Sequence, residues 1–353
     1  MSLRLLCLPG DGIGPEIVAA ARAVLEAACT KAGVVLTLDE RAIGFPTLAA
    51  SGTTIPEVVI DAARMADGVI LGPVSHNAYP PVVEGGLNPS GVLRRALRLH
   101  ANVRPARSHS AVPTPTGAKV DMVIVRENLE GFYADRNMAE GGGEFCPVPG
   151  VALAMRKITE GGSRAIAETA FALAARRGAS RVAVIHKANV MRMSDGLFLR
   201  VVREVAESYP EIAIDEVLVD AAAALMVRDP ARFEVVLATN MFGDILSDLA
   251  SELSGGLGLA ASLNHGAAHA VAQAQHGSAP DIAGQDRANP ASMIGSIAML
   301  MDHLGQPAIA KAITAGLDHA LADPATRTPD LGGGAGTTAM ARAIIDHVEG
   351  EQS

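Results

Sequence analysis

The sequence has few aromatic residues and few charges for its length. Its 353 residues include no tryptophan, three tyrosines and seven phenylalanines, so aliphatic side chains and methionine must form the core. Only 19% of the residues are charged and 49% are hydrophobic, which excludes intrinsic disorder and allows a sizeable core. The length exceeds that of one typical domain and therefore predicts two.

Further absences limit the partners and the compartment. The formal net charge is -9 and no run of Lys or Arg occurs, so nucleic acid is not an expected partner. Cys7, Cys29 and Cys146 are scattered and form no C-x-x-C pair, which indicates reduced thiols. The first apolar run is too short for a signal peptide, and no run reaches membrane-spanning length. We therefore expect a cytoplasmic protein that binds no membrane.

A glycine-rich turn, PGDGIGPEI, follows the first apolar run. Dinucleotide-binding loops carry G-x-G-x-x-G between a strand and a helix. Here Gly10, Gly12 and Gly14 have the spacing G-x-G-x-G and Pro15 follows. The local context of strand, turn and helix fits such a loop, but the spacing does not, so a nucleotide would have to bind in another way.

Strand-like and helix-like segments alternate along most of the chain, which predicts an α/β fold with a largely buried sheet. The expected strands are residues 3–8, 34–39, 68–72, 181–185, 215–218 and 233–237. The expected helices are residues 15–32, 55–65, 196–209 and one from about Phe242. The segment 134–150, rich in Gly, Pro and charge, interrupts this alternation and resembles an excursion from the body.

Asp244 and Asp248 lie four residues apart on a predicted helix, so both carboxylates project from one face. Such a pair is often a solvated acidic face. Here Ile245, Leu246 and Leu249 are apolar neighbours, and two like charges on a partly buried helix require a cation or arginines. Oxygen ligands without His or Cys nearby favour Mg²⁺ or Mn²⁺.

Three arginines offer planar forks that suit carboxylates: Arg94, Arg104 and Arg126. Each alone could be a surface arginine. However, Arg126 ends the strand-like run VDMVIV, where ligand-facing residues of open α/β sheets lie. Together with the aspartates, the arginines suggest a polycarboxylate bound to a divalent metal.

Lys187 and Tyr133 are candidates for proton transfer. Lys187 directly follows a buried strand, and a desolvated lysine can act as a base, although a lone lysine is more often a surface residue. Tyr133 lies seven residues after Arg126 and by itself indicates only a core aromatic residue with a satisfied hydroxyl.

The segments PGDGIGPEI, RENLEGFY, HKANVM, FGDILSDLAS and HGSAPDIAGQDRANP together resemble the β-decarboxylating dehydrogenases, the relatives of 3-isopropylmalate and isocitrate dehydrogenases. The matching segments span residues 9–338 in the family's order. The resemblance implies a two-domain isopropylmalate dehydrogenase-like fold with a central mixed sheet, not a Rossmann fold. It implies a large domain of residues 1–102 and 255–353 with the cofactor loop. A smaller domain, 103–254, would carry the dimer interface and a clasp at about 134–160.

The resemblance also implies roles for individual residues. The substrate-binding residues would be Asn88, Ser90, Arg94, Arg104, Arg126 and Asn189. Asp244 and Asp248 of one subunit and Asp220 of the other would hold Mg²⁺ or Mn²⁺. Lys187, also from the partner subunit, would take the C2 hydroxyl proton through water, and Tyr133 would protonate the enolate after loss of CO₂. Such a shared site makes a homodimer necessary for activity.

The loop 276–289 is where the family binds its nicotinamide cofactor. The cofactor-binding residues would be His276, Gly277, Ser278, Ala279, Asp281, Ile282 and Asn289. Relatives that use NADP carry Lys-Tyr where this chain has Asp281 and Ile282. Because a carboxylate would repel the 2′-phosphate of NADP, the resemblance implies NAD.

Two features depart from the family's patterns. Ahead of Arg94, isopropylmalate enzymes have apolar residues and isocitrate enzymes have Ser and Asn, whereas Asn88 and Ser90 match neither pattern. Gln273 replaces a common Glu, and its neutral amide would not attract a positively charged nicotinamide.

We therefore expect an NAD- and Mg/Mn-dependent oxidative decarboxylation of a 3-substituted (R)-malate, similar to that of 3-isopropylmalate dehydrogenase. Isocitrate, homoisocitrate, tartrate or D-malate dehydrogenase activity is the alternative within the family. A non-catalytic regulatory paralogue, or a metal-dependent lyase or hydrolase without nicotinamide, are the alternatives from other classes.

Overall fold

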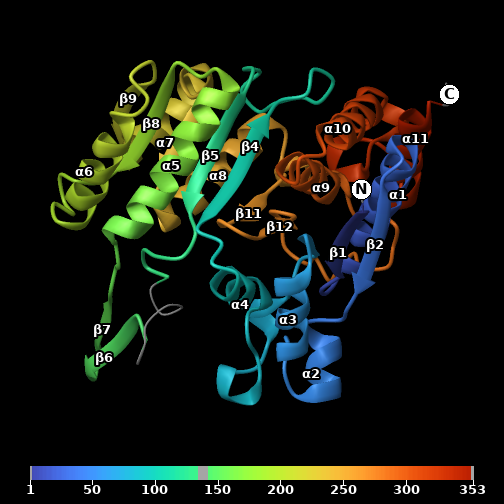
Figure 1. The fold of residues 1–353 in the computed structure, drawn as a ribbon, viewed down its shortest axis with the longest axis horizontal. Coiled ribbons are helices and arrows are strands. Elements are labelled where there is room, and N and C mark those ends of the chain that lie inside the picture. Colours follow the sequence, from blue (N-terminus) through green and yellow to red (C-terminus); the bar gives the residue numbers. More distant parts are fainter. Residues whose placement is uncertain (1, 134–141, 351–353) are drawn as a thin grey trace. The chain divides into compact units, whose positions relative to one another are not determined.

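A computed structural model describes residues 2–133 and 142–350, and the chain divides into two compact units (Figure 1). Unit 1 consists of Met1–Leu97, His109–Pro113 and Gly255–Ser353, and unit 2 of Arg98–Ser108 and Thr114–Ser254. Both ends of the chain therefore belong to unit 1. Across the described residues, no helix combines the length and the apolar character that crossing a membrane requires.

Unit 1 contains a mixed set of strands in the order β2-β1-β3-β12-β11. The pairs β1–β2, β1–β3 and β3–β12 are parallel, and β11–β12 is antiparallel. The strands are β1 (Ser2–Leu8), β2 (Val35–Glu40), β3 (Gly68–Leu71), β11 (Leu263–His265) and β12 (Ala270–Gln273). The helices are α1 (Gly14–Ala32), α2 (Phe45–Ser51), α3 (Glu57–Met65), α4 (Pro89–Ala96), α9 (Ala291–His303), α10 (Pro307–Ala322) and α11 (Thr337–Glu349). Helices α1, α9, α10 and α11 pack together around the aliphatic core of this unit.

Unit 2 contains strands in the order β4-β5-β10-β8-β9. Only β4–β5 is antiparallel among these pairs. The strands are β4 (Ala101–Arg107), β5 (Asp121–Glu127), β8 (Arg181–His186), β9 (Ala213–Leu218) and β10 (Val235–Ala238). The helices are α5 (Glu160–Arg177), α6 (Ser194–Ala206), α7 (Val219–Arg228) and α8 (Asn240–Ser254). Helix α5 packs against α6, and α7 packs against α8.

Short 3₁₀ turns connect several of these elements. They are His76–Ala78, Val82–Glu84, Pro230–Arg232, Leu257–Leu259, Pro324–Thr326 and Pro329–Leu331. The excursion expected at 134–150 contains β6 (Glu144–Val148), and β7 (Val151–Ala154), which pairs with it as an antiparallel hairpin, lies just beyond its expected end; the side chains of both strands are exposed. Residues 134–141 of the expected clasp lie outside the described residues.

The prediction of an α/β fold with mixed strand pairing is confirmed, and the expected elements differ from the observed ones mainly at their ends. Pro15 lies in the first turn of α1, and Gly33 ends this helix with a left-handed φ of 67°. Helix α3 begins at Glu57 rather than at residue 55, because Pro56 is extended and precedes the helix. Helix α8 begins at Asn240, two residues before the expected start.

In each unit the parallel strands end along one edge. The carboxyl ends of β1, β3 and β12 form that edge in unit 1, and those of β5, β8, β9 and β10 form it in unit 2. In open α/β sheets this edge is where ligands bind. It therefore defines where to look for the site in each unit.

Candidate active site

The carboxyl edge of unit 2 carries most of the charged residues predicted for the site. Arg126 is the next-to-last residue of β5, and Lys187 directly follows β8. Asp220 lies in the first turn of α7, which follows β9, and Asp244 in α8, which follows β10. Parallel pairing thus gathers residues that are far apart in the sequence.

Asp244 is the centre of a cluster of side chains from β4, β5, α8 and the segment that carries Tyr133. Its Oδ1 accepts a hydrogen bond from Arg104 Nη1 of β4 at 3.2 Å and another from Arg126 Nη1. Its Oδ2 accepts a bond from the Tyr133 hydroxyl at 3.1 Å. Arg104 Nη1 also lies 3.5 Å from Asp248 Oδ1. The structure therefore brings together five residues that the sequence proposed for substrate, metal and proton transfer.

Both arginines of this cluster are buried and held in place by neutral partners. Asn240 Oδ1 accepts from Nε and Nη2 of Arg126 at 3.0 and 2.7 Å. Arg104 donates to Asn102 Oδ1 through Nε and to Ser247 Oγ, at 2.7 Å, through Nη1. Burial, followed by the adjacent Arg126 charge, lowers the pKa of Arg104 to about 10. The forks are therefore oriented before any ligand binds.

Asn240, Asn102 and Ser247 were not predicted from the sequence. Asn240 stands two residues before the FGD segment and is fully buried, so the signal that could have found it is its place after the buried strand β10. Gly243 has a related role, because a Cβ atom there would lie 2.7 Å from Arg126 Cβ. The absence of a side chain lets α8 approach Arg126.

The aspartates of α8 are suitable ligands for a hydrated hard cation. The side chain of Asp244 is 34% exposed and that of Asp248 57% exposed. In the described parts of the chain, no three His, Cys, Asp or Glu side chains form a ready metal cage. Mg²⁺ commonly keeps several waters and uses one or two carboxylates plus the substrate, so the half-buried Asp244 and the exposed Asp248 fit it.

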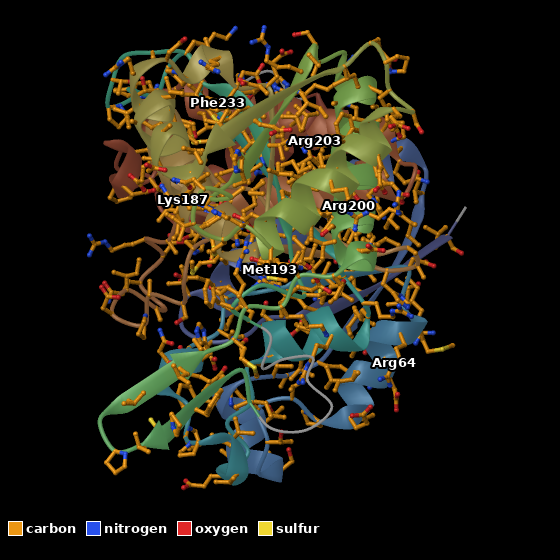
Figure 2. The ribbon with its side chains drawn as sticks, turned by 90° about the vertical axis from the view of Figure 1, so that its left-hand side faces the viewer. Arg64, Lys187, Met193, Arg200, Arg203 and Phe233 are labelled. Carbon is orange, nitrogen blue, oxygen red and sulfur yellow. The ribbon has the colours of Figure 1, made fainter. Side chains whose placement is uncertain are left out.

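Lys187 and Asp220 form a second charged pair in unit 2. Lys187 Nζ lies 2.6 Å from Asp220 Oδ1, and this bond to the ammonium lowers the pKa of the Asp220 carboxyl. Asn189, two residues further on, is exposed. Figure 2 labels Lys187 and the exposed Met193, which lie near the two ends of the loop between β8 and α6.

The residues predicted to select the substrate lie at the start of α4 in unit 1. Asn88 is the N-cap of this helix and its Oδ1 accepts from Gly91 N at 3.3 Å. Ser90 is buried and donates to Gln273 Oε1 at 3.1 Å, an oxygen that Asn264 Nδ2 also reaches at 3.3 Å. Arg94 is half-buried in the last turn of α4. Gln273 thus links the predicted specificity segment to β12.

The predicted cofactor loop follows β12 and packs against the first glycine-rich turn. Ile13 N donates to Ser278 O at 2.8 Å, and the hydroxyls of Ser75 and Ser278 lie 2.7 Å apart. A Cβ atom on Gly12, which has φ of 56°, would lie 2.0 Å from Ser278 O. The loop therefore requires glycine at position 12.

The other predicted cofactor residues continue along the same loop. His276 Nδ1 lies 3.0 Å from Gly277 O, and burial lowers the pKa of its imidazole. Ala279 has φ of 34°, and Asp281 is exposed beside the half-buried Ile282. Asn289 is buried, and its Nδ2 donates to Asp330 Oδ2 at 2.9 Å. These loop residues thus differ widely in exposure.

Asp11, within the glycine-rich turn, joins three segments of unit 1. Its Oδ1 accepts from Phe45 N at 2.9 Å, and its Oδ2 accepts from Ser75 N at 3.0 Å and from the Tyr79 hydroxyl. Burial and this carboxylate raise the pKa of Tyr79. The sequence indicated only the glycines of this turn, and Asp11 was missed because a lone acidic residue among glycines carries no distinctive signal.

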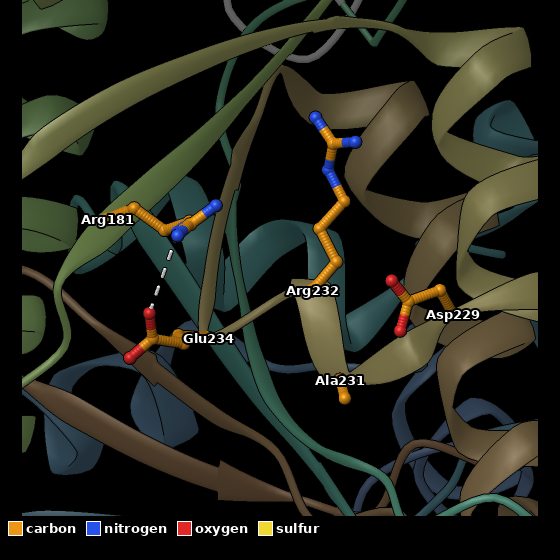
Figure 3. Close-up of a pocket in the computed structure, with 5 residues that line it drawn as sticks. All are labelled: Arg181, Asp229, Ala231, Arg232 and Glu234. Carbon is orange, nitrogen blue, oxygen red and sulfur yellow. Dashed lines mark ion pairs between the residues drawn. The ribbon is translucent and has the colours of Figure 1, made fainter.

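A pocket of unit 2 lies away from these residues. It is lined by Arg181, Asp229, Ala231, Arg232 and Glu234 (Figure 3). Arg181 begins β8 and Glu234 precedes β10, so the pocket is at the amino ends of these strands, opposite Lys187. Arg181 Nε lies 3.9 Å from Glu234 Oε1 and Arg232 Nη2 lies 2.8 Å from Asp215 Oδ2. It contains none of the residues predicted for the site and lies at the opposite ends of the strands from Lys187, so it is not the candidate site.

The chain is similar to known proteins over nearly its whole length. The family model described as isocitrate/isopropylmalate dehydrogenase matches residues 4–348. The chain is 40% identical to the isocitrate/homoisocitrate dehydrogenase of Thermus thermophilus over 346 residues, 98% of each protein. It is 38% identical to the 3-isopropylmalate dehydrogenase of Archaeoglobus fulgidus over 341 residues, 97% of this chain and 98% of that protein. It also superposes on a crystal structure of isocitrate dehydrogenase from Methylococcus capsulatus with a TM-score of 0.89 and 40% identity, covering 98% and 99% of the two chains.

Proposed function

This chain belongs to the isocitrate/isopropylmalate dehydrogenase family, and we propose that it catalyses the NAD- and Mg²⁺- or Mn²⁺-dependent oxidative decarboxylation of a 3-substituted (R)-malate. The observation that carries the proposal is the cluster on Asp244. Two buried arginines and a tyrosine hydroxyl donate to the carboxylate of Asp244, which also keeps part of its surface exposed. A malate presents two carboxylates and a hydroxyl, the groups that such a cluster can bind.

The side chains of the chain have distinct tasks in this reaction. Arg104 and Arg126 bind the malate carboxylates, and the family resemblance assigns Arg94 to the substrate as well. Lys187 takes the proton of the C2 hydroxyl through water, and the Tyr133 hydroxyl delivers a proton to C3 after CO₂ leaves. Asp244 and Asp248 would hold the divalent ion, which supplies Lewis acidity at the C2 oxygen when bound. NAD supplies the hydride acceptor.

The loop 276–289 is proposed to bind NAD through the residues described above. Asp281 supports NAD over NADP, because its exposed carboxylate would repel a 2′-phosphate. Unit 1 would correspond to the large, cofactor-binding domain and unit 2 to the smaller domain with the dimer interface. Lys187 and Asp220 would serve the site of the partner subunit in a cytoplasmic homodimer.

We propose 3-isopropylmalate or a similar apolar 3-substituted malate as the substrate. The support is that Asn88 and Ser90, the polar residues ahead of Arg94, are both engaged within unit 1. The second candidate is isocitrate or homoisocitrate, which the names of two of the relatives and the polar character of Asn88 and Ser90 favour.

Formation of NADH at 340 nm tests the proposal, with Mn²⁺, NAD and a panel of 3-isopropylmalate, isocitrate, homoisocitrate, tartrate and D-malate. One substrate should be preferred, and Lys187→Ala should abolish its turnover while NAD binding, measured by calorimetry, persists. No turnover of any substrate by a protein that binds NAD would instead support the regulatory paralogue. Metal and substrate binding without NAD binding would favour a lyase or hydrolase.

A further inference from the structure

Asp195 is a fully buried carboxylate that contacts the main chain of Lys187. It lies in the first turn of α6, and its Oδ2 accepts a hydrogen bond from Lys187 N at 2.5 Å. Its Oδ1 lies 2.6 Å from Arg156 Nη1. One carboxylate oxygen therefore accepts a main-chain hydrogen bond, and the other forms an ion pair with Arg156.

Arg156 connects this carboxylate to the start of α8. It follows the hairpin strand β7, and its side chain is 8% exposed. Its Nη1 donates to Ser194 Oγ at 2.7 Å and its Nη2 to Thr239 Oγ1 at 3.1 Å. Its guanidinium also lies 5.6 Å from the centre of the Phe242 ring. Both Thr239 and Phe242 are close in sequence to Asp244.

A buried ion pair is weak evidence of a contribution to stability. Removing two charges from water costs about as much as their attraction returns, and apolar replacements are often neutral or stabilising. This pair, however, also binds the main-chain N–H of Lys187, the proposed catalytic lysine, so it can hold that lysine in place. The Lys187 side chain starts from that main-chain position and reaches Asp220 Oδ1 at 2.6 Å.

We propose that Asp195 and Arg156 are positioning residues, whose buried pair ties the main chain of Lys187 to the start of α8 in its own unit, so that the lysine is held in place for the proposed site of the partner subunit. This inference rests on the proposed function, because it assigns a task to residues that support Lys187. It adds Arg156, which follows the hairpin strand β7, to the residues that support the proposed site. The sequence did not connect this position with catalysis.

Asp195→Asn tests the proposal with little change of shape. Its amide is neutral, so the ion pair with Arg156 is lost and Lys187 N keeps at most an uncharged acceptor. Misplacement by about 1 Å can cost about 10²-fold in rate, so kcat should fall roughly 10- to 100-fold. KM for the substrate should stay within about twofold, because the substrate arginines are untouched.

The double variant Asp195→Asn/Arg156→Met separates positioning from folding. It removes both charges, so its Tm should recover relative to either single variant. Its kcat should stay low, because Lys187 N then has only a neutral, weaker acceptor and α8 still lacks the guanidinium. Arg156→Lys keeps the positive charge and should retain more kcat than Arg156→Met. Recovery of kcat together with Tm in the double variant would show that the pair only stabilises the fold and would overturn the proposal.

Asp215→Asn is the matched control. It breaks the ion pair with Arg232 in the same unit, at the opposite end of the strands from Lys187. It should lower Tm slightly and leave kcat unchanged. A fall in kcat as large as that of Asp195→Asn would mean that any lost ion pair in this unit impairs turnover, contrary to the proposal.

Amide hydrogen exchange of the peptide that contains Lys187, followed by mass spectrometry, needs no turnover. Asp195→Asn should speed exchange there at least tenfold, and Asp215→Asn should not. Unchanged exchange in Asp195→Asn overturns the positioning role, even if the wild type proves inactive. An inactive wild type with faster exchange in Asp195→Asn would refute the proposed function while upholding the main-chain restraint.

Discussion

The two units present different chemistry at the carboxyl edges of their strands. In unit 2 the edge carries charged side chains, among them the buried Arg104 and Arg126 on Asp244. In unit 1 the corresponding edge consists of glycine-rich turns whose contacts are mostly main-chain, such as Ile13 N to Ser278 O. Its one buried carboxylate there, among the described turn residues 9–14, is Asp11, which binds two main-chain N–H groups.

This difference suits the two edges to different ligands of the proposed reaction. Side-chain charges can bind a small, highly charged substrate and a metal, and their effect depends on orientation more than on shape. A surface built from main-chain turns instead provides close approach for a large, flat ligand such as a dinucleotide. Substitutions should therefore act through charge and geometry in unit 2 and through shape in unit 1.

Arg126→Lys, in unit 2, should have the largest effect on turnover. The lysine keeps the charge but loses the fork that donates to both Asn240 and Asp244. We expect kcat/KM to fall about 10²- to 10³-fold, with both KM for the malate and kcat affected. Arg177→Lys, which alters an exposed pair with Asp121 in the same unit, is the control and should retain activity. Near-normal kcat/KM in Arg126→Lys would contradict the role of the fork.

Gly12→Ala should have the next largest effect, this time in unit 1. Gly12 and Gly33 both have positive φ, but only a Cβ on Gly12 meets an atom within 4 Å, Ser278 O. Gly33→Ala therefore measures backbone strain alone, about 1 kcal/mol of unfolding free energy. Gly12→Ala should destabilise more and raise KM for NAD about tenfold by displacing the cofactor loop. Equal KM values for NAD in the two variants would show that displacing the loop at Ser278 does not affect NAD binding, contrary to the proposal.

Glu127→Gln tests a buried carboxyl of unit 2 that, like Asp11, accepts main-chain N–H groups. Its oxygens accept from Leu129 N and Glu130 N at 2.7 and 2.8 Å. Burial raises its pKa from 4.5 to about 7, despite these bonds. Between those values the folded protein holds a proton that the unfolded chain has released, so stability falls as pH rises.

The Glu127 contribution is thus complete below pH 4.5 and lost above about pH 7. Urea unfolding at intervals from pH 4.5 to 8 should show a flatter profile for Glu127→Gln than for the wild type. The two curves should differ by up to about 3 kcal/mol across the interval. The exposed Glu207→Gln serves as the control. Parallel curves for Glu127→Gln and the wild type would place the titrating group elsewhere.

The sequence predicted much of the fold and part of the site for identifiable physical reasons. Short runs of consecutive apolar residues located β8 and β10 to within two residues, because strands buried on both faces consist almost entirely of hydrophobic residues. The spacing of Asp244 and Asp248 on one helix face was visible because helix geometry is local. Asn240, Asp11 and Asp195 were missed, because their importance comes from partners 34–114 residues away or from a main-chain contact that no side-chain pattern encodes.

Gln273→Glu should have the smallest effect on turnover. It tests the contrast between the two edges, because it adds a charge to the edge of unit 1, where main-chain turns predominate. Gln273 Oε1 accepts from Ser90 and Asn264, and a carboxylate can accept both bonds unchanged. The new negative charge should favour the positively charged nicotinamide, lowering KM for NAD a few-fold at low ionic strength. The gain should shrink as salt rises, because exposed charges are screened over about 8–10 Å. Initial rates at varied NAD and two salt concentrations measure it, with Gln275→Glu, two residues after Gln273, as the control. If Gln275→Glu lowers KM for NAD equally, the effect comes from net charge rather than from position 273. The edge of unit 1 would then bind the proposed cofactor through its shape and not through a charge at position 273.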